Sequence, residues 1–364
     1  MTHIADLLAF GFGALTEYLS AHVLACLVPA FFIAGAIYVF VSKEQVVRYF
    51  GPSANKFVSY GIASISGTIL AVCSCTVLPL FAGIYRRGAG LGPAIAFLYS
   101  GPAVNVLAIV YTAKLLGFDL GLARAVGAIV FSVVIGLAMA ALFYRSERQR
   151  TSDNRDVFAE MAEAAAGDAE SERRKLVRNL VFFALWVVVL VFAARAGSSL
   201  AALQRVEFWI ALAALALIII ELAIWFRRDE VLEWLSGTWY FVKLITPWLL
   251  GGVFVAGIVR GYLPAEVVGR FLGGGGIGAN ALASVIGALM YFATLTEVPI
   301  IKALTEVGMG RGPALALLLA GPALSLPNML VIASVTGWKR ALTYIALVVV
   351  AATVTGFLLG PALA

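Results

Sequence analysis

The chain has 364 residues, of which 62% are hydrophobic and 13% charged, and its mean hydropathy is +0.99. An ordinary soluble domain is about half apolar and about a quarter charged, so this composition excludes a soluble globular protein. The net charge of +6 is modest and the positive residues lie mainly at the ends of apolar runs, where they contact lipid headgroups, so we expect no nucleic-acid binding. Three cysteines in a chain of this length do not make a disulfide framework. We therefore expect an all-α polytopic membrane protein whose main partner is the lipid bilayer.

The first predicted unit, residues 1–144, begins with an interfacial or short entry helix over 1–19. Spanning segments are expected over 21–42, 58–81, 91–116 and 120–144. Gly101-Pro102 divides the third of them, because proline removes a helix N–H and glycine loosens the backbone. In lipid the freed carbonyls need partners from protein or cavity water, so this break should face the protein interior.

Residues 145–178 form the long hydrophilic stretch of the chain, in which arginines alternate with acids. The basic excess predicts a solvated linker on the cytoplasmic side, with a regulatory or partner-docking role as the alternative. Two connecting transmembrane helices follow within 179–228, over 179–197 and 206–226. Glu221 is interpreted as interfacial because it lies close to Arg227 and Arg228.

The second predicted unit covers residues 229–364, with apolar segments over 240–262, 279–303, 313–336 and 341–360. The four glycines at 273–276 follow no predicted strand and lack the Lys-Ser/Thr of a phosphate-binding loop. A flexible loop is the better interpretation. The chain also carries no ATP-binding motif, so the driving force would be an ion gradient or a separate subunit. We expect no cofactor.

The stretch 64–110 recurs near the C-terminus when 220 is added to each residue number, without a gap. Among the residues whose type recurs at this offset are Gly67, Thr76, Pro79, Gly88, Gly90, Gly92, Pro93, Ala94, Ala96, Leu98, Gly101, Pro102 and Ala103, and the same offset relates Gly117 to Gly337. This self-similarity predicts a duplicated unit and about ten apolar segments in a four, two, four arrangement.

The relative orientation of the two units depends on how often each segment crosses the membrane. Six single crossings between equivalent positions make the units parallel, whereas a re-entrant Gly-Pro segment in each unit leaves five crossings and inverts them. We favour inverted units. Broken segments at matching positions of two halves are typical of secondary transporters with a midplane site.

Cys73 and Cys75 place two thiols in one short segment, just before Pro79. Thiolates are soft ligands suited to Cu(I), zinc or trivalent arsenic-like species. Residues i and i+2 share a side in an extended segment but lie about 200° apart on a regular helix, so joint ligation requires a broken helix. The alternative is that these are small, inert packing residues, which is also how Cys26 is interpreted.

Glu297 stands where the first unit has Val77. A carboxylate at the bilayer centre costs on the order of 2.5–3.5 kcal/mol, so it ordinarily faces a cavity, a cation or a proton path. It is therefore the candidate for proton coupling or for compensating a cationic substrate. The alternative is an interfacial Glu297 paired with Lys302.

Polar side chains near the breaks complete the set of candidate substrate-binding residues. They are Thr76, Asn105, Thr296, Ser325 and Asn328. Their amide and hydroxyl groups can bind a ligand or satisfy the carbonyls that the breaks release, and both roles stay open.

The chain resembles the predicted permease family that includes bacterial methylarsenite efflux permeases and YraQ-like permeases. The motifs that carry this resemblance are Cys73–Pro79, Gly92-Pro93, Gly101–Asn105 and Gly321–Asn328. The likeness covers both units, about two thirds of the chain. It implies a multi-pass exporter of the cytoplasmic membrane for trivalent organoarsenicals or another soft, thiol-seeking solute such as a metal ion. The family's cysteine motif corresponds to Cys73 and Cys75. Ala293 and Leu295 stand at the matching positions of the second unit, which excludes a symmetric four-thiol site.

The resulting hypothesis is a secondary transporter rather than an enzyme, working by alternating access between the two broken segments. Cys73 and Cys75 would act as soft metal or metalloid ligands and Glu297 as the coupling residue. A membrane thiol oxidoreductase using Cys73 and Cys75 is the alternative from another class, although the usual Cys-x-x-Cys spacing is absent. A channel-like pore is the third.

Overall fold

The computed structural model describes residues 2–20, 27–40, 50, 54–70, 74–152, 169–196, 205–262, 271–290, 297–306 and 308–363. Every regular element in this part of the chain is a helix, as the composition predicted. Four described helices are long and apolar enough to cross a bilayer: α8 (Phe118–Leu142), α12 (Val206–Trp225), the Arg228–Ile258 part of α13 (Arg228–Tyr262), and α19 (Trp338–Leu363). A bent pair makes a possible fifth span. The expectation of about ten segments stays a prediction.

Several predicted spans consist of two shorter helices, and neither helix of such a pair is long enough to cross a bilayer alone. The first unit contains α4 (Lys56–Leu70), α5 (Ser74–Arg86), α6 (Leu91–Ala103) and α7 (Val106–Leu116) as well as α8, and the short α9 (Tyr144–Ser152) begins at its end and runs into the predicted linker. The second contains α15 (Ile277–Leu289), α16 (Glu297–Glu306), α17 (Arg311–Ala320) and α18 (Leu326–Thr336). The bounds of α7 and α18 differ by 220 residues at both ends.

The first break lies slightly later than the glycine and proline predicted. Helix α6 continues through Gly101 and Pro102, and α7 begins at Val106 after a bend of 47° between the two apolar helices. Proline is tolerated here because the last turn of a helix is already losing its regular bonding. In the second unit, α17 ends at Ala320, directly before Gly321.

Glycine pairs let neighbouring helices approach backbone to backbone in both units. A Cβ added to Gly136 of α8 would lie 2.7 Å from the carbonyl oxygen of Gly92 on α6. A Cβ on Gly356 of α19 would lie 2.7 Å from the carbonyl oxygen of Gly312 on α17. Close crossings of this kind are how helices associate tightly inside lipid, where burial of apolar side chains gives little driving force.

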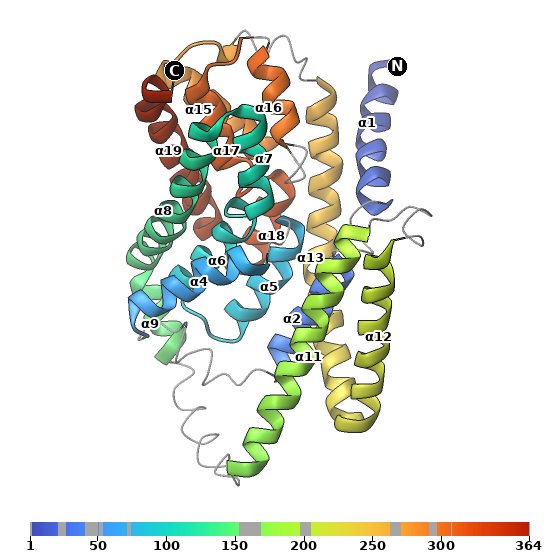
Figure 1. Cartoon of the computed structure of the whole chain (residues 1–364). Helices are drawn as coiled ribbons and strands as arrows, with labels where there is room; N and C mark the ends of the chain where they lie inside the picture. The colour runs from blue at the N-terminus through green and yellow to red at the C-terminus, as the bar shows by residue number, and fades with distance from the viewer. Residues whose placement is uncertain are drawn as a thin grey trace.

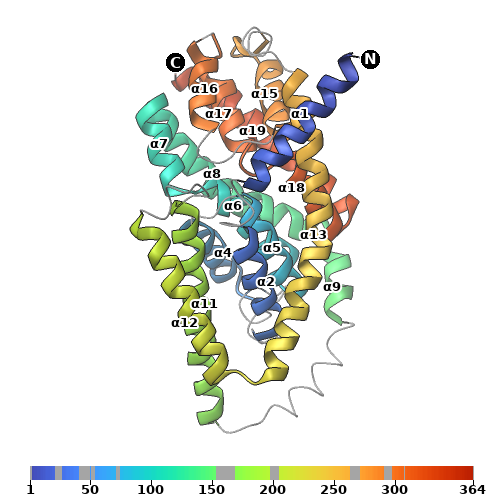
Figure 2. The same ribbon diagram turned by 90° about the vertical axis from the view of Figure 1, so that its right-hand side faces the viewer.

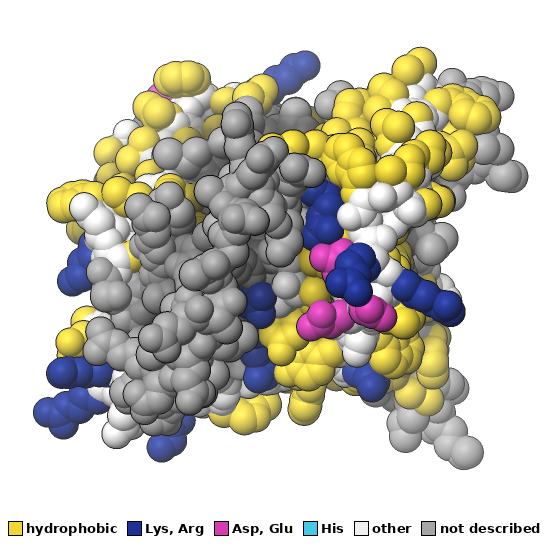
Figure 3. Space-filling model, turned by 90° about the horizontal axis from the view of Figure 1, so that it is seen from below, with side chains coloured by type: hydrophobic (Ala, Val, Ile, Leu, Met, Phe, Trp, Pro, Cys, Tyr) yellow, Lys and Arg dark blue, Asp and Glu magenta, His cyan; other side chains and the backbone are white. Residues whose placement is uncertain are grey.

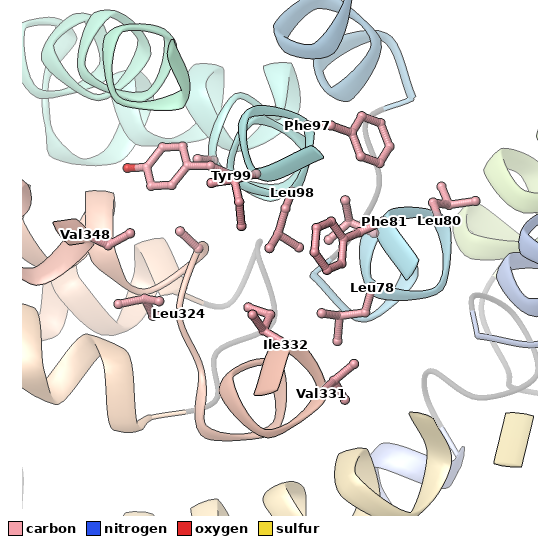
Figure 4. Close-up of a cluster of buried hydrophobic side chains, with 14 of the residues drawn as sticks. Leu78, Leu80, Phe81, Phe97, Leu98, Tyr99, Leu324, Val331, Ile332 and Val348 are labelled. Carbon is pink, nitrogen blue, oxygen red and sulfur yellow. The ribbon is translucent and has the colours of Figure 1, made fainter. Parts of the chain in front are cut away.

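The helices of the two units interlock. In Figures 1 and 2, α4 and α5 lie below α15, α16 and α17, with α6 near mid-height between them. Helix α7 packs against α16, and α18 packs against α5, so one helix of each unit contacts the other unit. Figure 4 shows Leu78 of α5 pointing toward Ile332 of α18 inside the buried apolar core.

The remaining helices flank this centre. The long α13 packs against both α1 (Thr2–Tyr18) and α2 (Val28–Phe40), and α11 (Ala169–Ala196) forms a hairpin with α12. Phe32 stacks on Trp186, with ring centroids 4.9 Å apart, which joins α2 to α11. Of the predicted linker 145–178, the described ends are helical, in α9 and α11.

Candidate functional site

Glu297 is the first residue of α16 and is almost completely buried, with an exposed fraction of 1%. Its Oε2 accepts a hydrogen bond from Nη2 of Arg124 at 3.1 Å. The alternative of an interfacial acid paired with Lys302 is therefore wrong. Glu297 is buried because α8 brings a cation to it from a position 173 residues away in the chain.

Arg124 itself is fully buried and connects three helices. It lies on α8, roughly 9 Å along the helix from its first residue. Its Nη1 donates a hydrogen bond of 2.9 Å to Oγ1 of Thr112 on α7, and Thr112 in turn donates to the carbonyl of Ala108. The guanidinium thus joins a helix of the second unit to two helices of the first.

This ion pair does not use all of its hydrogen-bonding capacity. Among the described residues, neither Oε1 of Glu297 nor Nε of Arg124 has a hydrogen-bond partner. Buried polar groups are ordinarily paired, and burying two ions costs several kcal/mol each before their attraction is counted. Within the described part of the chain, one acceptor and one donor are therefore left without a partner at a buried position, where an unpaired polar group is costly.

The Glu297 carboxylate lies directly against the second break. A Cβ built on Gly321 would be 2.7 Å from Oε1 of Glu297, so any side chain larger than hydrogen would have to displace the carboxylate. Two tyrosines hold the adjoining backbone, because Tyr344 donates to the Ala323 carbonyl and Tyr99 donates to that of Leu319. The Glu297 carboxylate is thus in contact with Gly321, directly after the end of α17.

Three other predicted residues lie beside the breaks. Asn105 accepts a hydrogen bond of 3.3 Å from the backbone N–H of Ala108, at the start of α7. Ser325 accepts one of 3.4 Å from the N–H of Asn328, at the start of α18. Both side chains therefore cap helices, which is the structural role left open by the sequence. Asn328 is buried, and its Oδ1 has no hydrogen-bond partner among the described residues.

The predicted thiol pair cannot be placed as a pair. Cys73 and Thr296 lie outside the described residues, and Cys75 is placed only as a backbone position in the first turn of α5. Thr76 follows it on the same helix and is buried. Ligation of a soft metal or metalloid by Cys73 and Cys75 therefore stays a prediction.

Arg124 and Thr112 were not among the predicted site residues. A signal for Arg124 was present, because it is the single charged residue of the apolar run 120–144, and an ionisable residue inside a span indicates a functional site. Thr112 had no such signal, since threonine hydroxyls in membrane helices commonly bond to their own backbone, as this one also does.

The matching positions of the other unit carry a different chemistry. At an offset of 220 residues, Val77 corresponds to Glu297, Tyr344 to Arg124, and Ile332 to Thr112. Val77, Tyr344 and Ile332 are all buried. We call Glu297, Arg124 and Thr112 the charged half-site, and Val77, Tyr344 and Ile332 the apolar half-site.

Comparison with known proteins gives similarity over nearly the whole chain. A family model described as "Predicted permease" (ArsP_1) matches residues 9–360. UPF0718 protein MJ0584 of Methanocaldococcus jannaschii is 43% identical over 367 residues, covering 99% of this chain and 98% of its own. UPF0718 protein YraQ of Escherichia coli is 24% identical over 306 residues, covering 82% of this chain and 66% of its own. No solved structure matches the chain.

Proposed function

We propose that this chain, which belongs to the family of predicted permeases and is a membrane transporter, exports a soft, thiol-seeking solute across the cytoplasmic membrane. The substrate class is trivalent organoarsenicals such as methylarsenite, with a soft metal ion as the second choice. The observation that carries this choice is the Cys73-Ser74-Cys75 spacing in the sequence, of which Ser74 and Cys75 begin α5. Two thiolates provide soft ligands that an oxygen-seeking ion would not require.

The proposed mechanism is alternating access between two inverted units, each broken in its middle. It is supported by the shared 220-residue spacing of α7 and α18, and by their reciprocal packing against α16 and α5. The turns before α8 and α19 are also alike: Gly117 has φ 109° and Gly337 has φ 91°. Inverted units are the usual basis for exposing one site to either side in turn.

The proposed orientation puts the lower end of Figure 1 in the cytoplasm. The basic linker ends, α9 and the start of α11, lie at this end, together with the connection between α12 and α13. Seen from below in Figure 3, Lys and Arg side chains lie along the left margin of the face and in a group right of its centre, where acidic side chains lie beside them. A positive excess next to the spans is typical of the cytoplasmic side.

The substrate proposal is tested by uptake of methylarsenite into everted membrane vesicles. We expect Cys73→Ser/Cys75→Ser to reduce accumulation by at least about tenfold relative to the unchanged protein, because the hydroxyl is a poor ligand for a soft centre. Cys26→Ser is the matched control and should leave accumulation unchanged. Equal accumulation by the double variant and the unchanged protein would contradict the proposal.

The same vesicles separate the two alternatives. A thiol oxidoreductase predicts unchanged accumulation in the double variant together with lost oxidation of an added dithiol. A channel-like pore predicts flux that only follows the solute's own gradient, with no accumulation against it. Concentrative uptake that depends on both cysteines contradicts both alternatives.

A further inference from the structure

We propose that Arg124 is a tethered counter-ion of Glu297, and that the transport cycle exchanges this guanidinium for a proton. In the state described, Arg124 neutralises the carboxylate. In the alternative state, a proton bonded to a Glu297 oxygen does so, and Arg124 has left. This rests on the proposed transport function and adds the ion to which transport is coupled.

The fold itself does not require the charges. In the apolar half-site, Val77 and Ile332 fill the positions equivalent to Glu297 and Thr112, and the helices pack there without an ion pair. Replacing a buried ion pair by well-packed apolar residues is often neutral or stabilising. A charged pair kept in one half-site only is therefore better explained by a role in the cycle than by stability.

The geometry of the pair favours exchange over a permanent bond. Arg124 reaches Glu297 with one nitrogen rather than through the two parallel bonds that make arginine–carboxylate pairs strong. Its Nη1 also donates a hydrogen bond to Thr112, and this bond remains available to the guanidinium when the bond to Glu297 breaks. Protonation forms one O–H bond on Glu297 and breaks one O–H bond of the hydronium ion that delivers the proton from the water on one side of the membrane, with no change of oxidation state. The proton departs to the opposite side when Arg124 returns.

Few other titratable groups face Glu297 among the described residues. From α8 it meets Arg124, and the Tyr99 phenol of α6 lies within electrostatic range of both. From α7, Lys114 is exposed and Tyr111 is half-buried, while α17 has its one cation, Arg311, at its exposed start. A tyrosine stays neutral near pH 7, so Arg124 is the permanent charge that sets the affinity of Glu297 for a proton.

The state of the carboxylate is transmitted to the backbone through the Gly321 contact. Because Oε1 lies only 2.7 Å from where a Cβ of Gly321 would be, a carboxylate that reorients after losing Arg124 changes the space available to the backbone at Gly321, where the second break begins. The break is where α17 and α18 are joined, and α18 packs on the other unit. Proton exchange and rearrangement of the two units would thus be linked by a direct contact.

The test uses the full-length protein in detergent and follows the infrared band of a protonated buried carboxyl as pH is changed. Glu297→Gln should remove the band. Arg124→Gln should move its midpoint upward by at least about one pH unit, because loss of a neighbouring cation favours the protonated acid. Arg340→Gln breaks the separate Arg340–Glu147 pair, 3.2 Å long, and should leave the midpoint unchanged.

Transport is measured in parallel with methylarsenite in proteoliposomes under an imposed pH gradient. Arg124→Gln/Glu297→Gln, which removes both charges and so avoids an uncompensated ion, should fold but lose the response to the gradient. A band that does not titrate, an unshifted midpoint in Arg124→Gln, or a response to a sodium gradient alone would overturn the inference. A titrating band without methylarsenite transport would instead refute the proposed substrate and leave the counter-ion role standing.

Discussion

The charged half-site and the apolar half-site occupy equivalent positions of two related sequence stretches, yet they bury side chains of different chemistry. Between α16, α8 and α7 the chain buries Glu297, Arg124 and Thr112 in a hydrogen-bonded group. Between α5, α18 and α19 it buries valine, isoleucine and a tyrosine that reaches a backbone carbonyl. The packing of the helices therefore requires only apolar contact at these positions. The ion pair is an addition, and additions that cost desolvation energy indicate function.

The strongest way to break this comparison is to put a lone charge into the apolar half-site. We expect Val77→Glu to destabilise the protein by about 3–5 kcal/mol, because a buried carboxylate without a partner stays uncompensated. Adding Tyr344→Arg should recover part of the loss by recreating the pair of the other half. Thermal unfolding in detergent measures both. A double variant no more stable than Val77→Glu would show that the two half-sites are not geometrically equivalent.

The core beside the apolar half-site, at Leu78, should depend on side-chain volume rather than on charge. Leu78 is fully buried and points toward Ile332 in Figure 4, so Leu78→Ala should cost about 2–5 kcal/mol through lost contacts and the cavity left behind. Ile219→Ala on α12, whose side chain is exposed on the outer surface, should change stability by about 0.5 kcal/mol or less. Chemical denaturation compares them, and equal losses would contradict a packed core at Leu78.

The contact between the charged half-site and its break is tested with a single methyl group. Gly321→Ala should lower the transport rate roughly tenfold, since relieving the clash with Glu297 Oε1 costs about 1–3 kcal/mol. Gly251→Ala on α13 is the matched control, because nothing lies within 4 Å of the added carbon. Initial rates in proteoliposomes give the comparison, and an unaffected Gly321→Ala would separate the acid from the break.

The smallest expected effect concerns the caps that both units share. Ser325→Ala and Asn105→Ala should each destabilise the protein by about 1 kcal/mol, since each leaves the first turn of a helix without its side-chain acceptor. The two losses should add in the double variant, because the caps serve different helices. Neither substitution should alter the pH dependence of transport. A changed pH profile would assign these residues to the coupling site instead.

The two breaks also show where prediction from the sequence stops. Recurrent Gly and Pro correctly located a discontinuity in each unit, because backbone stereochemistry is a local property. The residue at which each helix ends also depends on the contacts that the backbone makes around the break. Helix α6 runs past Pro102 to Ala103, with Asn105 capping the next helix, whereas α17 ends before Gly321, where the Glu297 carboxylate occupies the neighbouring space.

Sequence alone was enough for the helical membrane class, the family and the choice of Glu297 as a candidate, because hydropathy acts through local physical preferences, and the 220-residue register stays a prediction. The caps at Asn105 and Ser325 are local too, since each joins residues three positions apart, but the sequence left that role open beside ligand binding. The pairing of Arg124 with Glu297 was settled by the tertiary structure, because the two residues lie 173 positions apart. A buried charge is neutralised by whichever helix packs against it, and that choice depends on how distant segments meet in space.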